Sequence, residues 1–171
     1  IDLIPVAYQY LGHQEEGTKM KFWVEDGIAH YPISSNAADE QILMNELMSD
    51  PSLQTILDKA EQEGKAKAES LGYEGTAKRN VIDSYRFSAL NFATNYRVFD
   101  LNGQFSSNRA SYFHKSLGGY HGAKLRNINN LYDFHLSKMN NKVLDMLNVK
   151  YYIQQNEQSV AARPIPTAMG N

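Results

Sequence analysis

Short apolar runs alternate with long stretches of helical periodicity, and this order most constrains what the chain can fold into. NYRVFDLNG (95–103) and VKYYIQ (149–154) each predict a short buried strand, the first ending in an Asn-Gly turn. IDLIPVAYQYL (1–11) predicts another, placed at an edge or bulge by Pro5. Helical segments between buried strands predict an α/β fold with a small, largely parallel or mixed sheet and several helices.

The region between the first two predicted strands is helical in pattern and is expected to be an insertion, 34–94. Asn36 or Asp39 can cap its start, Asp50-Pro51 breaks it, and Gly72 or Gly75 ends the second helix. We expect Gly64 to weaken that helix. A third helix follows over 76–94, with Thr76 as a possible cap. The apolar positions expected to be buried are Ile42, Leu43, Leu47, Met48, Leu53, Ile56, Leu57, Ala60, Val81, Ile82, Tyr85, Leu90 and Phe92.

Two more helices are predicted before and after residue 138. The first runs from His121 to about Ser137 and the second over 139–148. Residues beyond the strand at 149–154 are expected to form a Gln-rich loop and a Pro-rich exit. MKFWVEDGI (20–28) fits either a short extended piece or a surface loop.

Composition predicts a single folded domain. The chain has 171 residues, of which 42 % are hydrophobic and 21 % charged, and its net charge of −2 favours neither nucleic acid nor a membrane surface. The absence of cysteine excludes disulfides, thiolate metal sites and a cysteine nucleophile. No run reaches the roughly 20 apolar residues of a membrane helix, and no signal peptide is present. Because the chain starts at Ile1 and ends abruptly, we expect it to be a piece of a longer protein.

SYFHKSLGGYHGAKLR (111–126) is the least ordinary stretch of the sequence. If 111–115 is extended, Tyr112 and His114 share one face. Gly118-Gly119 then allows a sharp turn into a helix, whose free N–H groups can hold an anion such as a phosphate or sugar phosphate. The charge for such a site would come from Lys115, Lys124 and Arg126.

A structural role for this stretch is the competing interpretation. Its glycine spacing fits neither a P-loop nor a dinucleotide fingerprint, and a Gly-Gly pair between strand and helix is more often a simple turn. The residues alone therefore favour a turn and leave the anion site open. The histidines show no metal-ligand spacing and no GxSxG nucleophile elbow occurs, so no metal, cofactor or catalytic residue is assigned. Residues 105–150 carry a local net charge of +5, which is weak evidence for nucleic acid.

Five segments together resemble the YfhO-like bacterial membrane proteins. They occur in the family's order and are DLIPVAYQYL (2–11), NYRVFDLNG (95–103), SNRASYFHKSLGGYHGAKLRNINNLYDFHL (107–136), NNKVLDMLNVKYYI (140–153) and PTAMGN (166–171). The central block is long and specific, whereas 12–94 matches little. The chain reads KLRNINN where the family pattern tends to be KLRRYQ, so one basic charge of the block is missing.

The resemblance implies an extracytoplasmic domain of a multi-pass protein similar to the glycosyltransferase-C superfamily. Catalysis in that superfamily usually lies in an early loop between membrane helices, so this segment is expected to be non-catalytic. Its expected partners are the parent's membrane helices and a polyprenyl-phosphate sugar donor or glycopolymer acceptor, without nucleic acid. A structural cap and a free-standing enzyme using His114 or His121 are the alternatives. The ligand-binding candidates are Asn108, Arg109, His114, Lys115, Gly118, Gly119, Tyr120, His121, Lys124 and Arg126.

Overall fold

The computed structural model describes residues 33–102, 105, 107–120, 125–156 and 159–165. The strand predicted at 1–11 and the extended piece predicted at 20–28 lie outside these residues. Helices α3 (Ala37–Ser49), α4 (Leu53–Ser70) and α5 (Gly75–Ala93) come first along the described chain and precede the sheet. The other helices of the described residues are η2 (Ala110–Tyr112), α6 (Arg126–Phe134), η3 (Leu136–Lys138) and α7 (Asn141–Met146).

Within the described residues the sheet has three strands, in the order β1-β2-β3. β1 (Arg97–Asp100) pairs in parallel with β2 (Val149–Asn156), and β2 pairs antiparallel with β3 (Ser159–Pro164). The α/β class with a small mixed sheet and dominant helices is therefore confirmed, as are the strands predicted at 95–103 and 149–154. The loop predicted after residue 154 is wrong, because β2 turns back and pairs with β3 as a hairpin.

The free edge of β1 is covered by part of the central block (107–136), which contains the Gly118-Gly119 pair and is called the Gly-Gly block, or the block, from here on. Val98 bridges to Ser116, with hydrogen bonds from the Val98 N–H to Lys115 O and from the Leu117 N–H to Val98 O. Residues 111–115 are not the predicted extended segment, since η2 occupies 110–112. As a result, Tyr112 is 51 % exposed while His114 is buried, and the two do not share a face.

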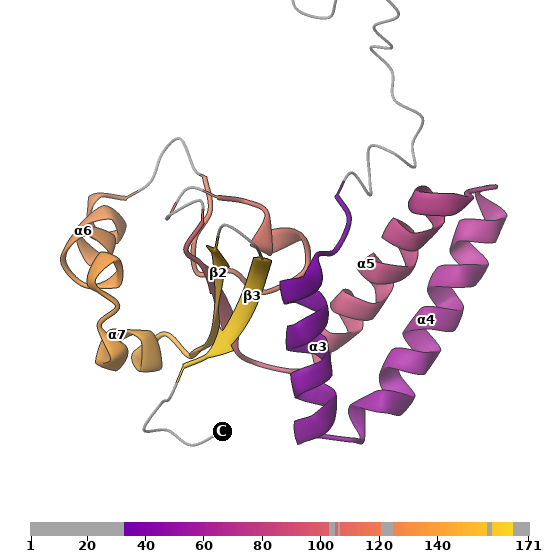
Figure 1. Ribbon diagram of the computed structural model, residues 1–171, viewed down its shortest axis with the longest axis horizontal. Helices are drawn as coiled ribbons and strands as arrows, with labels where there is room; N and C mark the ends of the chain where they lie inside the picture. Colours follow the sequence, from indigo (N-terminus) through magenta and orange to yellow (C-terminus); the bar gives the residue numbers. More distant parts are fainter. Residues whose placement is uncertain (1–32, 103–104, 106, 121–124, 157–158, 166–171) are drawn as a thin grey trace, which may run out of the picture.

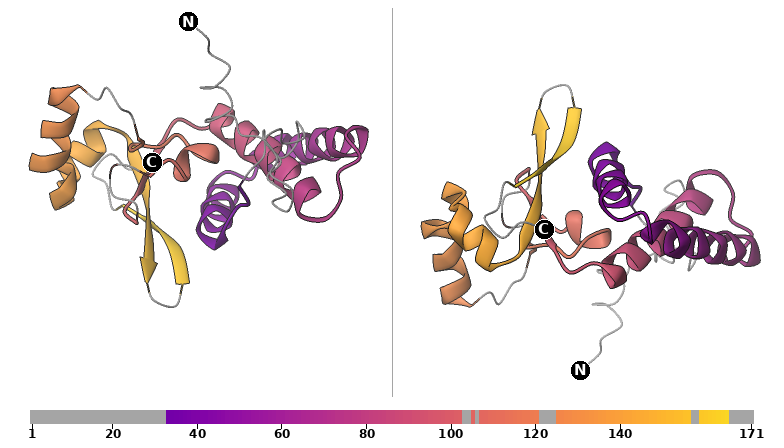
Figure 2. Two further views of the ribbon diagram at one scale, coloured as in Figure 1. Left: turned by 90° about the horizontal axis from the view of Figure 1, so that it is seen from above. Right: turned by 90° about the horizontal axis from the view of Figure 1, so that it is seen from below.

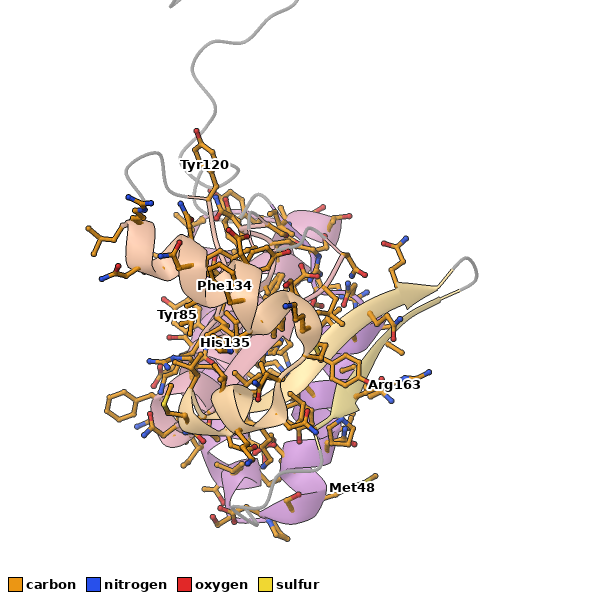
Figure 3. All side chains as sticks on the ribbon, turned by 90° about the vertical axis from the view of Figure 1, so that its left-hand side faces the viewer. Met48, Tyr85, Tyr120, Phe134, His135 and Arg163 are labelled. Atoms are coloured by element: carbon orange, nitrogen blue, oxygen red, sulfur yellow. The ribbon has the colours of Figure 1, made fainter. Side chains whose placement is uncertain are left out.

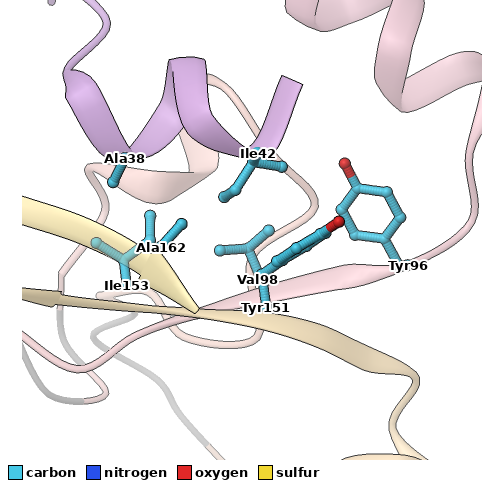
Figure 4. Packing of buried hydrophobic residues seen from close by; sticks show 7 residues of the cluster. All are labelled: Ala38, Ile42, Tyr96, Val98, Tyr151, Ile153 and Ala162. Carbon is cyan, nitrogen blue, oxygen red and sulfur yellow. The ribbon is translucent and has the colours of Figure 1, made fainter. Parts of the chain in front are cut away.

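Helix α3 lies between the sheet and the α4–α5 helix pair (Figure 1). Ala38 and Ile42 pack on one face of the sheet, against Val98, Ile153 and their neighbours (Figure 4). Leu43 faces the other way and packs with Leu57 and Phe87 of the helix pair. α3 is therefore wedged between two units and buries apolar side chains on both sides.

The opposite face of the sheet is covered by the later helices, so the molecule is elongated with α6 and the α4–α5 pair at its two ends (Figure 2). Phe99 of β1 packs there with Leu136 and Leu144. α6 starts at Arg126, later than predicted; residues 121–124 lie outside the described part of the chain. Leu125, the N-cap residue of α6, is 69 % exposed.

In the helical region 34–94, the sequence predicted where the helices begin and end better than it predicted which of their residues are buried. Asn36 caps α3 in a capping box with Asp39, and α4 is terminated by Gly72, which follows the C-cap Leu71 and whose φ of +68° favours glycine. Thr76 is not the α5 cap; that position is Glu74. Met48, Ile56 and Phe92 are exposed instead of buried, whereas Phe87 fills the core.

Gly64 has a packing role that helix propensity does not reveal. A Cβ at this position would lie 3.0 Å from Ile82 Cα and 3.3 Å from Tyr85 Cβ. The missing side chain therefore lets α4 and α5 approach each other closely.

Candidate functional site

A buried carboxylate on α3 collects two side chains of the Gly-Gly block. Asp39 is fully buried, and its Oδ1 accepts hydrogen bonds from Arg109 Nη1 at 3.2 Å and from His114 Nε2 at 3.2 Å. Arg109 Nη2 donates to Oδ2 at 2.5 Å, which makes the arginine contact bidentate. The Asn36 N–H completes the set at 2.9 Å. Residues about 70 positions apart in the sequence thus meet at one carboxylate.

The electrostatics of this cluster keep Asp39 ionised. Burial alone would raise the pKa of the Asp39 carboxyl, but the hydrogen bonds from His114, Arg109 and the Asn36 backbone, together with the Arg109 charge, hold that pKa below its usual value of 3.8. An ionised carboxylate only accepts hydrogen bonds, so Nε2 of His114 carries the proton. The other ring nitrogen, Nδ1, is buried with no hydrogen-bond partner among the described residues.

Aromatic rings close the space around the cluster. The His114 ring meets Phe87 edge-on at 5.2 Å between centroids, and Phe87 meets Phe113 in the same way at 5.2 Å. The Arg109 guanidinium lies 5.5 Å from the centroid of Phe113. The His114 side chain has no exposed surface, so it cannot reach a substrate as a general base in this conformation. The arrangement ties α3, α5 and the block together.

The exposed part of the block is organised by Asn108. Its side-chain Oδ1 accepts a hydrogen bond from the Tyr120 N–H at 2.5 Å. Gly119 has a φ of +153°, and a Cβ there would lie 3.2 Å from the same Oδ1. A Cβ on Gly118 would lie 3.4 Å from Phe105 O, an ordinary contact, and the Gly119 N–H bonds to Phe105 O at 3.0 Å. The positive φ of Gly119 and its tight approach to Asn108 therefore favour glycine at this position, which is how a structural turn uses one.

The remaining candidates are divided between the surface and the undescribed residues. Lys115 is exposed, but its Nζ donates a hydrogen bond to Thr94 O at 2.7 Å. Tyr120 is 72 % exposed and projects from the loop above α6 (Figure 3), and Arg126 is exposed in the first turn of α6. His121 and Lys124 lie outside the described part of the chain.

A second polar cluster lies about two turns further along α3, and sequence reasoning missed it. The buried Glu46 accepts a hydrogen bond at Oε1 from the Tyr151 hydroxyl at 2.6 Å and forms an ion pair with Lys150 Nζ at 2.8 Å. Burial raises the pKa values of Tyr96 and Tyr151, and the Glu46 carboxylate raises them further. The one available signal was a Glu seven positions after Asp39, which places both acids on one side of a helix.

Neither a metal-binding cluster nor a membrane-spanning helix is found in the part of the chain that the structure describes. No group of three or more His, Cys, Asp or Glu side chains fit to hold a metal occurs among the described residues. None of the described helices combines the length and apolar character of a membrane span. Searches of protein-family models, curated proteins and solved structures found no match to this chain.

Proposed function

We propose that this chain is a non-catalytic extracytoplasmic domain of a multi-pass membrane protein resembling cell-envelope glycosyltransferases. In this role it positions a polyprenyl-phosphate sugar donor or a glycopolymer acceptor. The proposal rests on the five segments that resemble YfhO-like proteins. The structural observation that supports it is that the side chains of the block fall into two groups. Arg109 and His114 bind the buried Asp39, whereas Tyr120 and Arg126 have exposed side chains.

This division suits a domain that holds a ligand without transforming it. An exposed guanidinium binds phosphate by charge-assisted hydrogen bonds, and an exposed aromatic ring can stack on a sugar face. His114, one of the two histidines of the enzyme alternative, is enclosed by Phe87 and engaged by Asp39, and His121 lies outside the described residues. The hydrogen bonds of Arg109 and His114 to Asp39 fix the position of the turn from which Tyr120 projects.

A purely structural cap is the second candidate, and one observation favours it. Arg109, His114, Asn108 and Lys115 all make contacts within the domain. If those contacts are the whole purpose of the block, removing Arg126 leaves every function of the parent protein intact. The two candidates therefore differ in what exposed side chains do, and not in the fold.

Location can be tested with a cysteine-labelling experiment, because the chain has no cysteine of its own. Ser70→Cys places a thiol at the exposed end of α4, and Ala68→Cys places one at a fully buried position. In a full-length gene product from which any cysteines outside these 171 residues have been removed, we expect an impermeant maleimide to label Ser70→Cys in intact protoplasts and to leave Ala68→Cys unlabelled. Labelling of Ser70→Cys only after lysis would refute an extracytoplasmic location.

Ligand binding is tested by flotation of the 171-residue chain with phosphatidylcholine vesicles, with and without undecaprenyl phosphate. We expect binding only with the phosphate lipid, weakened by about tenfold or more by Arg126→Ala, since a hydrogen bond to a charged group contributes about 1.5–3 kcal/mol. Lys138→Ala removes another exposed cation, from η3, and serves as the matched control. Equal binding by all three proteins, or none by the unmodified chain, would favour the structural cap.

A further inference from the structure

The side-chain amide of Asn108 has a fixed orientation, and this decides which of its groups meets solvent. The Tyr120 backbone N–H can only donate a hydrogen bond, so the Asn108 atom that it meets at 2.5 Å is the acceptor Oδ1. The Nδ2 group, with its two N–H donors, therefore points away from the Tyr120 N–H. Among the described residues no acceptor is found for Nδ2, and Asn108 is exposed. Asn108 thus offers two donors to solvent in a fixed direction.

The backbone that carries this amide is held by further hydrogen bonds. Asn108 O accepts from the Ser111 N–H at 3.2 Å and from Ser111 Oγ at 2.6 Å. The Arg109 N–H donates to Ser107 Oγ at 3.3 Å, and that hydroxyl donates to the buried Asp100 at 3.1 Å. Groups that are already fixed in this way lose little conformational freedom when a ligand binds.

An exposed aromatic ring belongs to the same turn as the amide. Tyr120 is 72 % exposed, projects from the loop (Figure 3) and takes part in none of the ring contacts found among the described residues. Because its own N–H bonds to Asn108, the ring and the Nδ2 donors lie at one place on the surface. A flat apolar face beside fixed donors suits a sugar, whose C–H face stacks on the ring while its oxygens accept hydrogen bonds.

The charge around the turn favours a neutral ligand. The described residues 105, 107–108 and 117–120 include no charged side chain, and the guanidinium of the adjacent Arg109 is engaged by Asp39. Nδ2 of Asn108 can only donate. A sugar hydroxyl both donates and accepts, whereas the carbonyl oxygen of an acetamido group only accepts, and the acetamido methyl adds apolar surface for the ring. An acetamido group therefore complements both Asn108 and Tyr120.

We propose that Asn108 and Tyr120 bind an N-acetylated hexosamine unit of a glycan. The Nδ2 donors of Asn108 bond to the acetamido carbonyl oxygen, and the Tyr120 ring stacks on the apolar face of the sugar. This inference rests on the function proposed above, and it names the sugar chemistry that the block recognises.

The test compares two soluble trisaccharides, chitotriose and cellotriose, which differ in carrying an acetamido group or a hydroxyl on each ring. Titration of the 171-residue chain is followed by NMR chemical shifts of the backbone amides, which also report whether each variant is folded. We expect a Kd of about 1 mM for chitotriose, since the site is one ring face and one amide, and binding weaker by about fivefold or more for cellotriose.

Two substitutions separate the contributions of the amide and the ring. Asn108→Asp keeps an acceptor for the Tyr120 N–H but replaces the two donors by an acceptor oxygen, so the preference for chitotriose should be lost while the fold is kept. Tyr120→Ala should weaken the binding of both trisaccharides by about fivefold or more. Tyr112→Ala is the matched control, because it removes another exposed ring of the block, and it should change neither affinity.

Three results would overturn the inference: no chemical-shift change up to about 20 mM chitotriose, equal affinity for the two trisaccharides, or a preference for chitotriose that Asn108→Asp retains. These results leave the flotation test of the proposed function intact, because that test depends on a phosphate lipid and on Arg126. If chitotriose binds as expected and flotation fails, the inference stands and the ligand is the glycopolymer acceptor, not the phosphate lipid.

Discussion

Replacing Asp39 by Asn removes one charge from the interior and keeps the shape of the side chain. The carboxylate has no exposed surface, and it accepts hydrogen bonds from Arg109, His114 and the Asn36 N–H. An amide offers one acceptor oxygen in place of two and presents an NH₂ group to a guanidinium or an N–H. The substitution therefore leaves at least one donor of the cluster without its partner.

The size of the effect follows from the burial of the two charges. Breaking a fully buried ion pair by removing one partner costs about 3–5 kcal/mol, and an exposed pair contributes about 0–1 kcal/mol. The Asp39 side chain is 0 % exposed and that of Arg109 is 29 % exposed, so this pair lies nearer the buried case. We expect a loss of about 2–4 kcal/mol of unfolding free energy, a large part of the 5–15 kcal/mol typical of a domain.

Urea unfolding monitored by circular dichroism measures this loss. Asp58→Asn is the matched control, because Asp58 is exposed on α4 and accepts one side-chain bond, from Gln54. It should change stability by less than about 0.5 kcal/mol. A double-mutant cycle with Arg109→Met, which keeps an apolar chain over Phe113, should give a coupling of about 1–3 kcal/mol between Asp39 and Arg109. An Asp39→Asn protein as stable as the control, or zero coupling, would refute the reasoning.

Two further predictions concern pH and helix packing. The pKa of Asp39 is lowered in the folded state, so the Asp39 carboxylate stabilises the fold fully above the unfolded pKa near 3.8. This stabilisation is lost as pH falls from there through the folded pKa. In a profile of unfolding free energy from about pH 6 to about pH 2, Asp39→Asn should therefore flatten the acidic part. A stability profile of equal slope in both proteins would contradict this. Gly64→Val should lower the unfolding free energy by about 2 kcal/mol in thermal or urea unfolding, because the new Cβ would lie 3.0 Å from Ile82 Cα. The control Ala66→Val, at an exposed position of the same helix, should lower it by about 0.5 kcal/mol or less. Equal losses in the two variants would show that helix propensity, and not packing, is the cause.

Local signals in the sequence predicted where elements begin and end. The Asn36 cap, the Asp50-Pro51 break and the Gly72 terminus each depend on the conformation of a few neighbouring residues, and the structure has all three. The strands around Val98 and Tyr151 were also predicted, because short apolar runs between helices are typical of a buried sheet. These features need no knowledge of distant parts of the chain.

Choices that depend on distant residues were not predictable in the same way. Helical periodicity gave α5 two apolar sides, and only the position of α3 decides that Phe87 is buried and Phe92 exposed. β3 has weak strand propensity and exists because β2 offers it an edge. The extended prediction for 111–115 was wrong because His114 turns inward to a carboxylate 75 positions earlier.

Asp39 and Glu46, two acids of α3, show why the sequence predicted only part of the candidate site. Asp39 and Glu46 lie about two turns apart on the side of α3 that faces the sheet unit, and Ile42 packs on the sheet between them. An apolar contact alone is non-directional and would let the helix slide or rotate. Bidentate bonding of Asp39 at one end and bonding of Glu46 at the other fix both motions. Their partners make these two acids the residues that set the position of α3 and of the turn that presents Tyr120.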